Sequence, residues 1–138
     1  MDRLIRFGVS LERELLARFD RRARKTGHTN RSKAIADLVR ACLVEDEWAE
    51  GDEVIGVISL LYDHRQRELS KRLIELQHRH YTRVLSSQHI HLDHDTCIEV
   101  IVARGNPKEI TRLADLLRAS RGVKHACLSM SSTGKAIG

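Results

Sequence analysis

The first ten residues alternate between two sets of side chains. Ile5, Phe7 and Val9 lie on one side of an extended chain, and Leu4, Arg6, Gly8 and Ser10 lie on the other. A period of two residues is typical of a short amphipathic strand, which we predict over Arg3 to Val9.

The pattern then changes to helical spacing. Ser10 is a suitable N-cap for a first helix that ends at Gly27, and Asn30 is a suitable N-cap for a second. The sequence thus predicts strand, helix, helix within fifty residues. A lone strand has two unpaired edges, so we expect two copies of the chain to pair through it. The apolar positions of the two helices are Leu11, Leu15, Leu16, Phe19 and Ala23, then Ile35, Leu38, Val39, Cys42 and Leu43.

The rest of the chain predicts a βαββαβ order, the ferredoxin-like arrangement of an α+β domain. The expected elements are a buried strand from Val54 to Tyr62, a helix from Arg67 to Leu85, strands from Gln88 to Leu92 and Thr96 to Ala103, a helix from Asn106 to about Ala119, and a strand from Val123 to Met130. The acidic, glycine-containing stretch at 45–53 suggests the end of the second helix and a linker. We therefore predict domains at 1–46 and 54–138, joined by a linker at 47–53.

Composition narrows the class of protein. The chain has 138 residues. Residues 1–43 hold 11 basic and 5 acidic side chains, a net charge of +6, whereas residues 44–138 hold 13 basic and 14 acidic side chains, a net charge of −1. The longest apolar run, Val54 to Leu61, is too short to cross a bilayer, and the N-terminus lacks the apolar region of a secretory signal, so we expect an intracellular, cytoplasmic protein. Three widely spaced cysteines suggest free or metal-bound thiols. No nucleophile–base pair or phosphate-binding glycine loop suggests an enzyme.

Metal-binding residue types are concentrated between residues 64 and 97. His89 and His91 share one side of a strand, and a turn at 93–95 sets His91 opposite Cys97 and His89 opposite Glu99. We expect Ile90 and Leu92 to face the core and the histidines to face outward. Two imidazoles and a thiolate suit Zn²⁺, Cu²⁺ or Ni²⁺. A fourth ligand would come from His64, His78 or His80, of the same chain or another.

The basic N-terminal segment suggests DNA. Arg6, Gly8 and Ser10 would be exposed on a two-stranded ribbon, a shape that fits the major groove. Asn30, Arg31 and Ser32 at the start of the second helix offer backbone N–H groups to a phosphate.

These residues together resemble the NikR family, nickel-responsive repressors with a ribbon-helix-helix DNA-binding unit and an ACT-type regulatory domain. The resemblance is carried by Arg6-Phe7-Gly8-Val9-Ser10, by residues 27–37, by Gln77-His78, by residues 89–100 and by Arg121-Gly122-Val123-Lys124-His125. It implies a homotetramer, a dimer of dimers, that binds a palindromic operator in the major groove. It also implies one Ni²⁺ per subunit, bound by His89, His91 and Cys97 with His78 of a neighbouring subunit, while Gln77 and Glu99 orient the ligands.

Lys33 departs from that pattern. It stands where relatives usually carry a carboxylate next to the equivalent of Asp37, and that pair helps to hold a second cation, often potassium, between the domains. We therefore do not predict the second cation site. Two other functions fit the residues: a ribbon-helix-helix repressor whose ACT-type domain senses a small molecule, another metal or a protein, and a small metalloenzyme with Glu99 as its base.

Overall fold

The computed structural model describes residues 3–80 and 83–138. The chain divides into two compact units, Met1–Arg40 and Ala41–Gly138. Helix α2, Arg31–Glu50, begins in the first unit and ends in the second. None of the helices in the described residues combines the length and apolar character needed to cross a lipid bilayer.

The N-terminal unit holds helix α1, Arg13–Lys25, and the start of α2. Gly27 ends the α1 region with a positive φ of 85°, and the Asn30 side chain accepts a hydrogen bond from the Lys33 amide at 2.8 Å. The predicted end of the first helix and the predicted start of the second are confirmed. The N-cap predicted at Ser10 is wrong, because the N-cap is Glu12, two residues later, and it makes no side-chain cap.

The predicted strand is absent from the described residues 3–10 of this single chain. A strand is defined by its ladder of hydrogen bonds to a neighbour, and one copy of the chain offers this segment no neighbour. Its apolar side chains are exposed, including Ile5 at 85% and Phe7 at 73%. The small residues Ala23 and Ala34 are the buried hydrophobic residues of this unit. The unit therefore lacks a closed core of large side chains.

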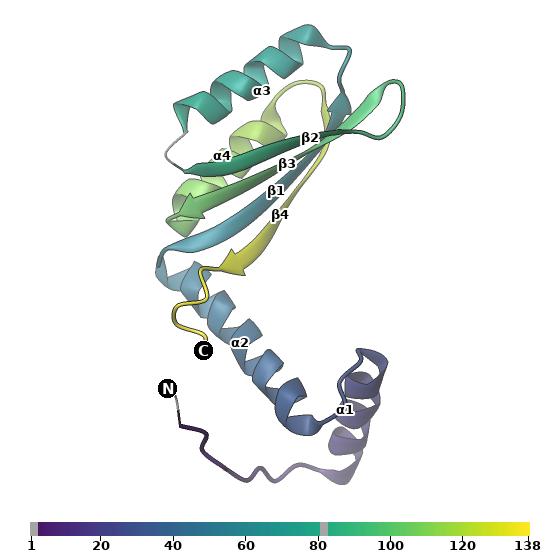
Figure 1. The fold of residues 1–138 in the computed structure, drawn as a ribbon, viewed down its shortest axis with the longest axis vertical. Coiled ribbons are helices and arrows are strands. Elements are labelled where there is room, and N and C mark those ends of the chain that lie inside the picture. The colour runs from purple at the N-terminus through teal and green to yellow at the C-terminus, as the bar shows by residue number, and fades with distance from the viewer. Residues whose placement is uncertain (1–2, 81–82) are drawn as a thin grey trace. The chain divides into compact units, whose positions relative to one another are not determined.

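The C-terminal unit confirms the βαββαβ order and the α+β fold (Figure 1). Its antiparallel sheet has the strand order β2-β3-β1-β4, so β2 and β4 are the edges. The elements are β1 (Val54–Asp63), α3 (Arg67–Arg79), β2 (Val84–His91), β3 (Thr96–Gly105), α4 (Pro107–Ala119) and β4 (Val123–Ser132).

Helix α3 is shorter than predicted. It ends at Arg79 instead of Leu85, and His80 follows as its C-cap. Val84 instead begins β2, where it pairs with Ala103. Helical spacing of apolar residues did not reveal this change, since Val84 fits the helical stripe as well as the strand. Tyr81, which the stripe also included, lies outside the described residues.

Helices α3 and α4 cover one face of the sheet and close a core. Alternate residues of β1 and β3 point into it, and Leu73 of α3 and Leu113 of α4 pack against them. Gly56 allows a close approach, because a Cβ there would lie 2.6 Å from Ile110 and 3.3 Å from Trp48. The other face, with Val57 and Val100, carries no helix (Figure 1).

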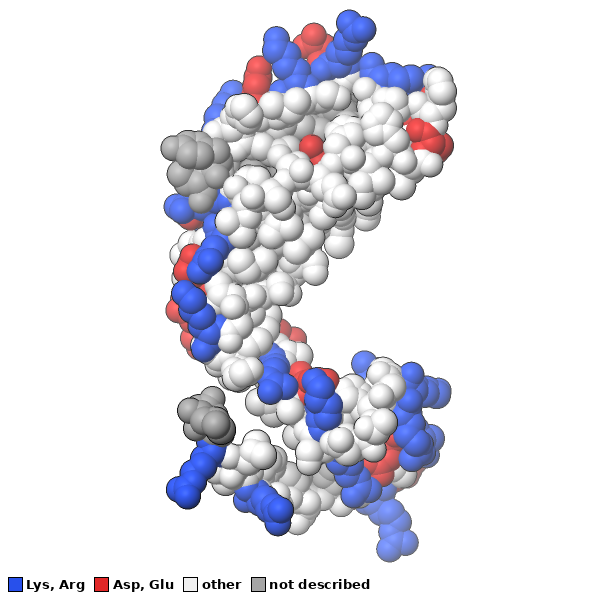
Figure 2. All heavy atoms as spheres, in the orientation of Figure 1, with Lys and Arg blue, Asp and Glu red and all other residues white. Residues whose placement is uncertain are grey.

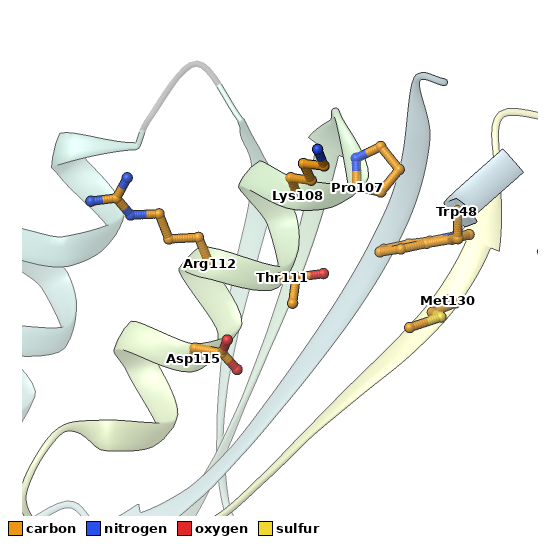
Figure 3. A pocket seen from close by; sticks show the side chains of 7 residues that line it. All are labelled: Trp48, Pro107, Lys108, Thr111, Arg112, Asp115 and Met130. Atoms are coloured by element: carbon orange, nitrogen blue, oxygen red, sulfur yellow. The ribbon is translucent and has the colours of Figure 1, made fainter. Parts of the chain in front are cut away.

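The end of α2 packs on this unit. Residues 47–50, which we assigned to a linker, are helical, and the Trp48 indole donates a hydrogen bond to the Ser131 carbonyl at 2.8 Å. A shallow hollow of about 370 Å³ lies between this indole and α4 (Figure 3). It is lined by Trp48, Pro107, Lys108, Thr111, Arg112, Asp115 and Met130.

Candidate metal centre and nucleic-acid interface

The β2–β3 hairpin has the predicted register. His91 pairs with Cys97 and His89 pairs with Glu99. The turn is held by the Asp93 carboxylate, which accepts hydrogen bonds from the amides of Asp95 at 2.9 Å and Thr96 at 2.8 Å. These bonds lower the pKa of Asp93. The local chemistry of an Asp-initiated turn thus sets which side chains meet across the hairpin.

The two hairpin histidines are exposed, as predicted, but they lie on the face of the sheet that the helices cover. His89 and His91 share a face with Cys97 and Glu99, and both of these β3 residues are buried on the helix-covered face. Ile90 lies on the opposite face and is 38% exposed. The expectation that Ile90 and Leu92 face the core is wrong. Register alone aligns a hairpin, but the helices decide which of its faces becomes the core.

Several ring side chains gather at this end of the sheet. The rings of His89 and His91 lie 5.3 Å apart, and the His64 ring lies 4.4 Å from that of His91. His64 follows β1, and its Nε2 lies 2.7 Å from the His94 carbonyl, to which it donates. Its Nδ1 therefore keeps a lone pair. Of the predicted fourth donors, His64 lies within this cluster.

His78 lies elsewhere, on the last turn of α3, and is exposed. His80 is the C-cap of the same helix. Within residues 3–80 and 83–138, no three or more His, Cys, Asp or Glu side chains are grouped so that they could hold a metal ion. The hairpin thus aligns donors of suitable chemistry, two imidazoles and a thiol, on one face, but within the described part of a single chain they are not grouped closely enough to hold a metal ion.

Gln77 and Glu99 form a buried pair beside the hairpin. The Gln77 amide donates to the Glu99 carboxylate at 3.2 Å, and the Ser87 hydroxyl donates to its other oxygen at 3.2 Å. Glu99 is 6% exposed, so these bonds offset the unfavourable burial of its charge.

Sequence reasoning did not single out Tyr62, whose hydroxyl lies 3.3 Å from His89 Nδ1. The pairing of Tyr62 with Cys97 across β1 and β3 emerges only from the fold.

Basic side chains gather over α1 in the N-terminal unit (Figure 2). Arg6, Gly8 and Ser10 are exposed, like all residues from 3 to 15 in the single chain. Arg31 and Ser32 open α2, where the first backbone N–H groups lack acceptors within the helix. Arg31 itself forms a two-bond ion pair with Asp20 of α1, at 2.8 and 2.9 Å. Its guanidinium therefore braces the two helices.

Asp37 lies among cationic groups. Lys33 and His28 donate to its two carboxylate oxygens, with His28 Nε2 at 2.8 Å, and Arg40 lies at 3.5 Å. The hydrogen bonds from Lys33 and His28 lower the pKa of Asp37 to about 2. His28 also bonds the Thr26 hydroxyl through Nδ1 at 3.0 Å. The Lys33 ammonium thus supplies a positive charge beside this carboxylate.

Two family models match the chain, and they match different parts of it. The ribbon-helix-helix protein, copG family, matches residues 5–45. The NikR C terminal nickel binding domain matches residues 55–131. The first match covers the N-terminal segment, including most of the predicted strand, and the second covers the sheet domain with the hairpin. This is the order of domains that the sequence predicts.

Full-length relatives are similar along almost the whole chain. A nickel-responsive regulator of Syntrophus aciditrophicus is 47% identical over 135 residues, covering 98% of each chain. One from Geobacter sulfurreducens is 47% identical over 138 residues and 99% of each chain, and one from Pyrococcus furiosus is 44% identical. An uncharacterized Thermotoga maritima protein of known structure shares the fold, with a TM-score of 0.52 and 15% identity over 57% of this chain and 98% of that one.

Proposed function

Because the chain belongs to the NikR family of nickel-responsive regulators, we propose that it is a repressor that binds a palindromic operator when Ni²⁺ occupies sites between its subunits. The observation that carries this proposal is the hairpin register, which sets His91 opposite Cys97 and His89 on the same face. Ribbon-helix-helix proteins bind DNA, and the relatives are regulators rather than enzymes. A protein that acts on operator DNA would be located in the cytoplasm.

The nickel ligands that we propose are His89, His91 and Cys97 of one chain and His78 of a second copy, with one Ni²⁺ per subunit. An N₃S donor set suits Ni²⁺. His78 is exposed on α3, which supports its donation to another subunit. The buried bond between Gln77 and Glu99 supports their role in orienting the ligands, since such outer partners fix the geometry of a metal site.

DNA recognition by Arg6, Gly8 and Ser10 requires a two-stranded ribbon. The exposed apolar side of the same segment, with Ile5 and Phe7, supports pairing with a second copy, which would bury those side chains. Asn30, Arg31 and Ser32 would hold a phosphate through backbone N–H groups. We assign this role to a domain at 1–46.

The sheet domain, which we place at 54–138, would join two ribbon dimers into a tetramer. Its helix-free face presents apolar side chains such as Val57, Val100 and Ile90, which another copy could cover. We propose that Ni²⁺ shifts the ribbon dimers toward positions that reach both operator halves. The ion must therefore bind those two arrangements with different affinity.

The surroundings of Asp37 bear on whether this chain needs a second cation. With the Lys33 ammonium bonded to it and the Arg40 guanidinium at 3.5 Å, this carboxylate already has cationic partners within its own unit. We propose that operator binding by this chain needs no added potassium ion at Asp37. Replacing potassium by another monovalent salt at equal ionic strength would leave nickel-dependent binding unchanged, whereas a loss of binding would contradict this proposal.

The first test is a nickel titration followed by absorption and by operator binding. We expect a thiolate-to-nickel charge-transfer band and tighter binding of the operator. Cys97→Ala would lose both responses, whereas Cys127→Ala, at an exposed cysteine outside the hairpin, would keep both. A Cys97→Ala protein that still responds to nickel as the wild type does would contradict the proposal.

A subunit-mixing experiment tests whether the site is shared. His78→Ala and Cys97→Ala chains would each fail to bind nickel alone. Co-refolded, they would recover about a quarter of the sites if subunits mix at random, because an intact hairpin can then meet an intact His78 from another copy. No recovery in tetramers that contain both chains would favour a fourth ligand from the same chain, for which His64 is placed.

A further inference from the structure

Tyr62 lies where β1 passes the hairpin. It is 1% exposed, points into the helix-covered face, and pairs with Cys97 on the neighbouring strand β3. Cys97 in turn pairs with His91 on β2. The three side chains therefore form one row across three strands, with His89 in the adjacent row.

The Tyr62 hydroxyl contacts two of the three hairpin ligands. Its oxygen lies 3.3 Å from His89 Nδ1, and the two rings meet edge to face at 84° with centroids 5.9 Å apart. Cys97, the strand partner of Tyr62 on β3, interacts with the same hydroxyl. A single buried oxygen thus links groups from β2 and β3.

The proton count of this hydroxyl allows both bonds at once. A phenol is protonated at neutral pH, since its ordinary pKa is about 10. It has one proton to donate and lone pairs to accept, so it can donate to a Cys97 thiolate while it accepts from His89 Nδ1–H.

This arrangement matters because the thiolate is the form that binds metal. Removing a thiolate from water is unfavourable unless a donor compensates it. A phenylalanine would fill the same core volume as Tyr62, so packing alone does not account for the hydroxyl. That hydroxyl contacts His89 and belongs to the strand partner of Cys97, and both of these residues are proposed ligands.

We propose that Tyr62 is a positioning residue of the nickel site, whose hydroxyl holds His89 and Cys97 toward one point and donates a hydrogen bond to the Cys97 sulfur. The inference rests on the proposed function, because it requires that the hairpin bind Ni²⁺. Tyr62 acts through the two ligands and is not itself a ligand.

The test is Tyr62→Phe, which removes the hydroxyl and keeps the ring. We expect nickel affinity, measured by competition with a chelator, to fall about 10-fold, the lower end of the range for removing a partner of a metal ligand. We also expect the charge-transfer band to move to longer wavelength, because a sulfur without its hydrogen bond releases an electron more readily. Loss of packing alone would not shift that band.

Two controls separate the possible outcomes. Unfolding of the metal-free variant measures any general loss of stability. A double-mutant cycle with His89→Ala, read as nickel affinity, measures the coupling between Tyr62 and its partner, and additive effects would overturn the proposal. Wild-type affinity together with an unshifted band in Tyr62→Phe would also overturn it. Absence of any nickel–thiolate band in the wild-type protein would instead refute the proposed function.

Discussion

The two units of this chain bury their side chains in opposite ways. In the C-terminal unit, Ile58, Leu60 and Leu73 are at most 1% exposed, and two helices close the core against the sheet. In the N-terminal unit, Phe7 and Leu15 stay more than half exposed, and the buried hydrophobic residues are alanines. Both segments have a clear apolar pattern, so the pattern does not distinguish them.

The difference shows what each unit needs in order to be stable. A βαββαβ chain can pair its own strands and cover one face of its own sheet. A unit of one strand and two helices holds no second strand with which the first could pair. Its apolar side chains therefore stay exposed unless a second copy covers them. The C-terminal unit therefore folds around an internal core, and the N-terminal unit is expected to fold as part of a dimer.

The largest effect is expected where that dimer would form. Phe7→Asp would place a charge in the ribbon interface and weaken operator binding about 100-fold or more. Sedimentation would show smaller assemblies. The matched control is Leu4→Asp, the same change on the other side of the segment, which would leave the assembly intact. Equal effects of both substitutions would show that the two sides of this segment do not differ.

A cavity in the closed core tests the other unit. Leu73→Ala would lower the free energy of unfolding by about 2–5 kcal/mol, because the buried leucine leaves a void. Ile74→Ala, at the next and 52% exposed position of α3, would change it by less than about 1 kcal/mol. Urea unfolding of the metal-free protein measures both. Similar losses from the two variants would mean that another subunit buries Ile74.

Helix caps offer a smaller and paired comparison. Asn30 caps α2 through the Lys33 amide, and Asn106 caps α4 through the Lys108 amide at 2.9 Å. Replacing either by alanine would destabilise its helix by about 1 kcal/mol. We expect only Asn30→Ala to weaken operator binding as well, because it disturbs the helix end proposed to hold phosphate. Equal DNA affinities in the two variants would argue against that contact.

The smallest effect concerns the charge cluster at Asp37. The pKa of Asp37 is about 2 in the folded chain against an ordinary value of 3.8, so its carboxylate stabilises the fold above the unfolded pKa. That contribution is lost as the pH falls from about 4 through about 2. Asp37→Asn would unfold more easily than wild type at neutral pH and converge with it below that window. Thermal unfolding across this pH range measures the difference.

Local chemistry in the sequence determined much of this protein. Alternation and spacing predicted the order of elements in the sheet domain, Asn30 and Asn106 marked helix starts, and the Asp93 turn set His91 opposite Cys97. These features depend on neighbouring residues along the chain, so a reader of the sequence can find them. The proposed set of nickel ligands, and the proposal that two subunits share each site, were instead inferred from resemblance to a family.

Tertiary structure decided which face of the hairpin the helices cover. It therefore placed His89 beside the buried Cys97 and left Ile90 on the opposite face. It also brought Tyr62, 27 residues before His89, within hydrogen-bonding reach of that histidine. Alternation reveals two faces of a strand but not which one a helix will cover, because that choice depends on packing between segments far apart in the sequence.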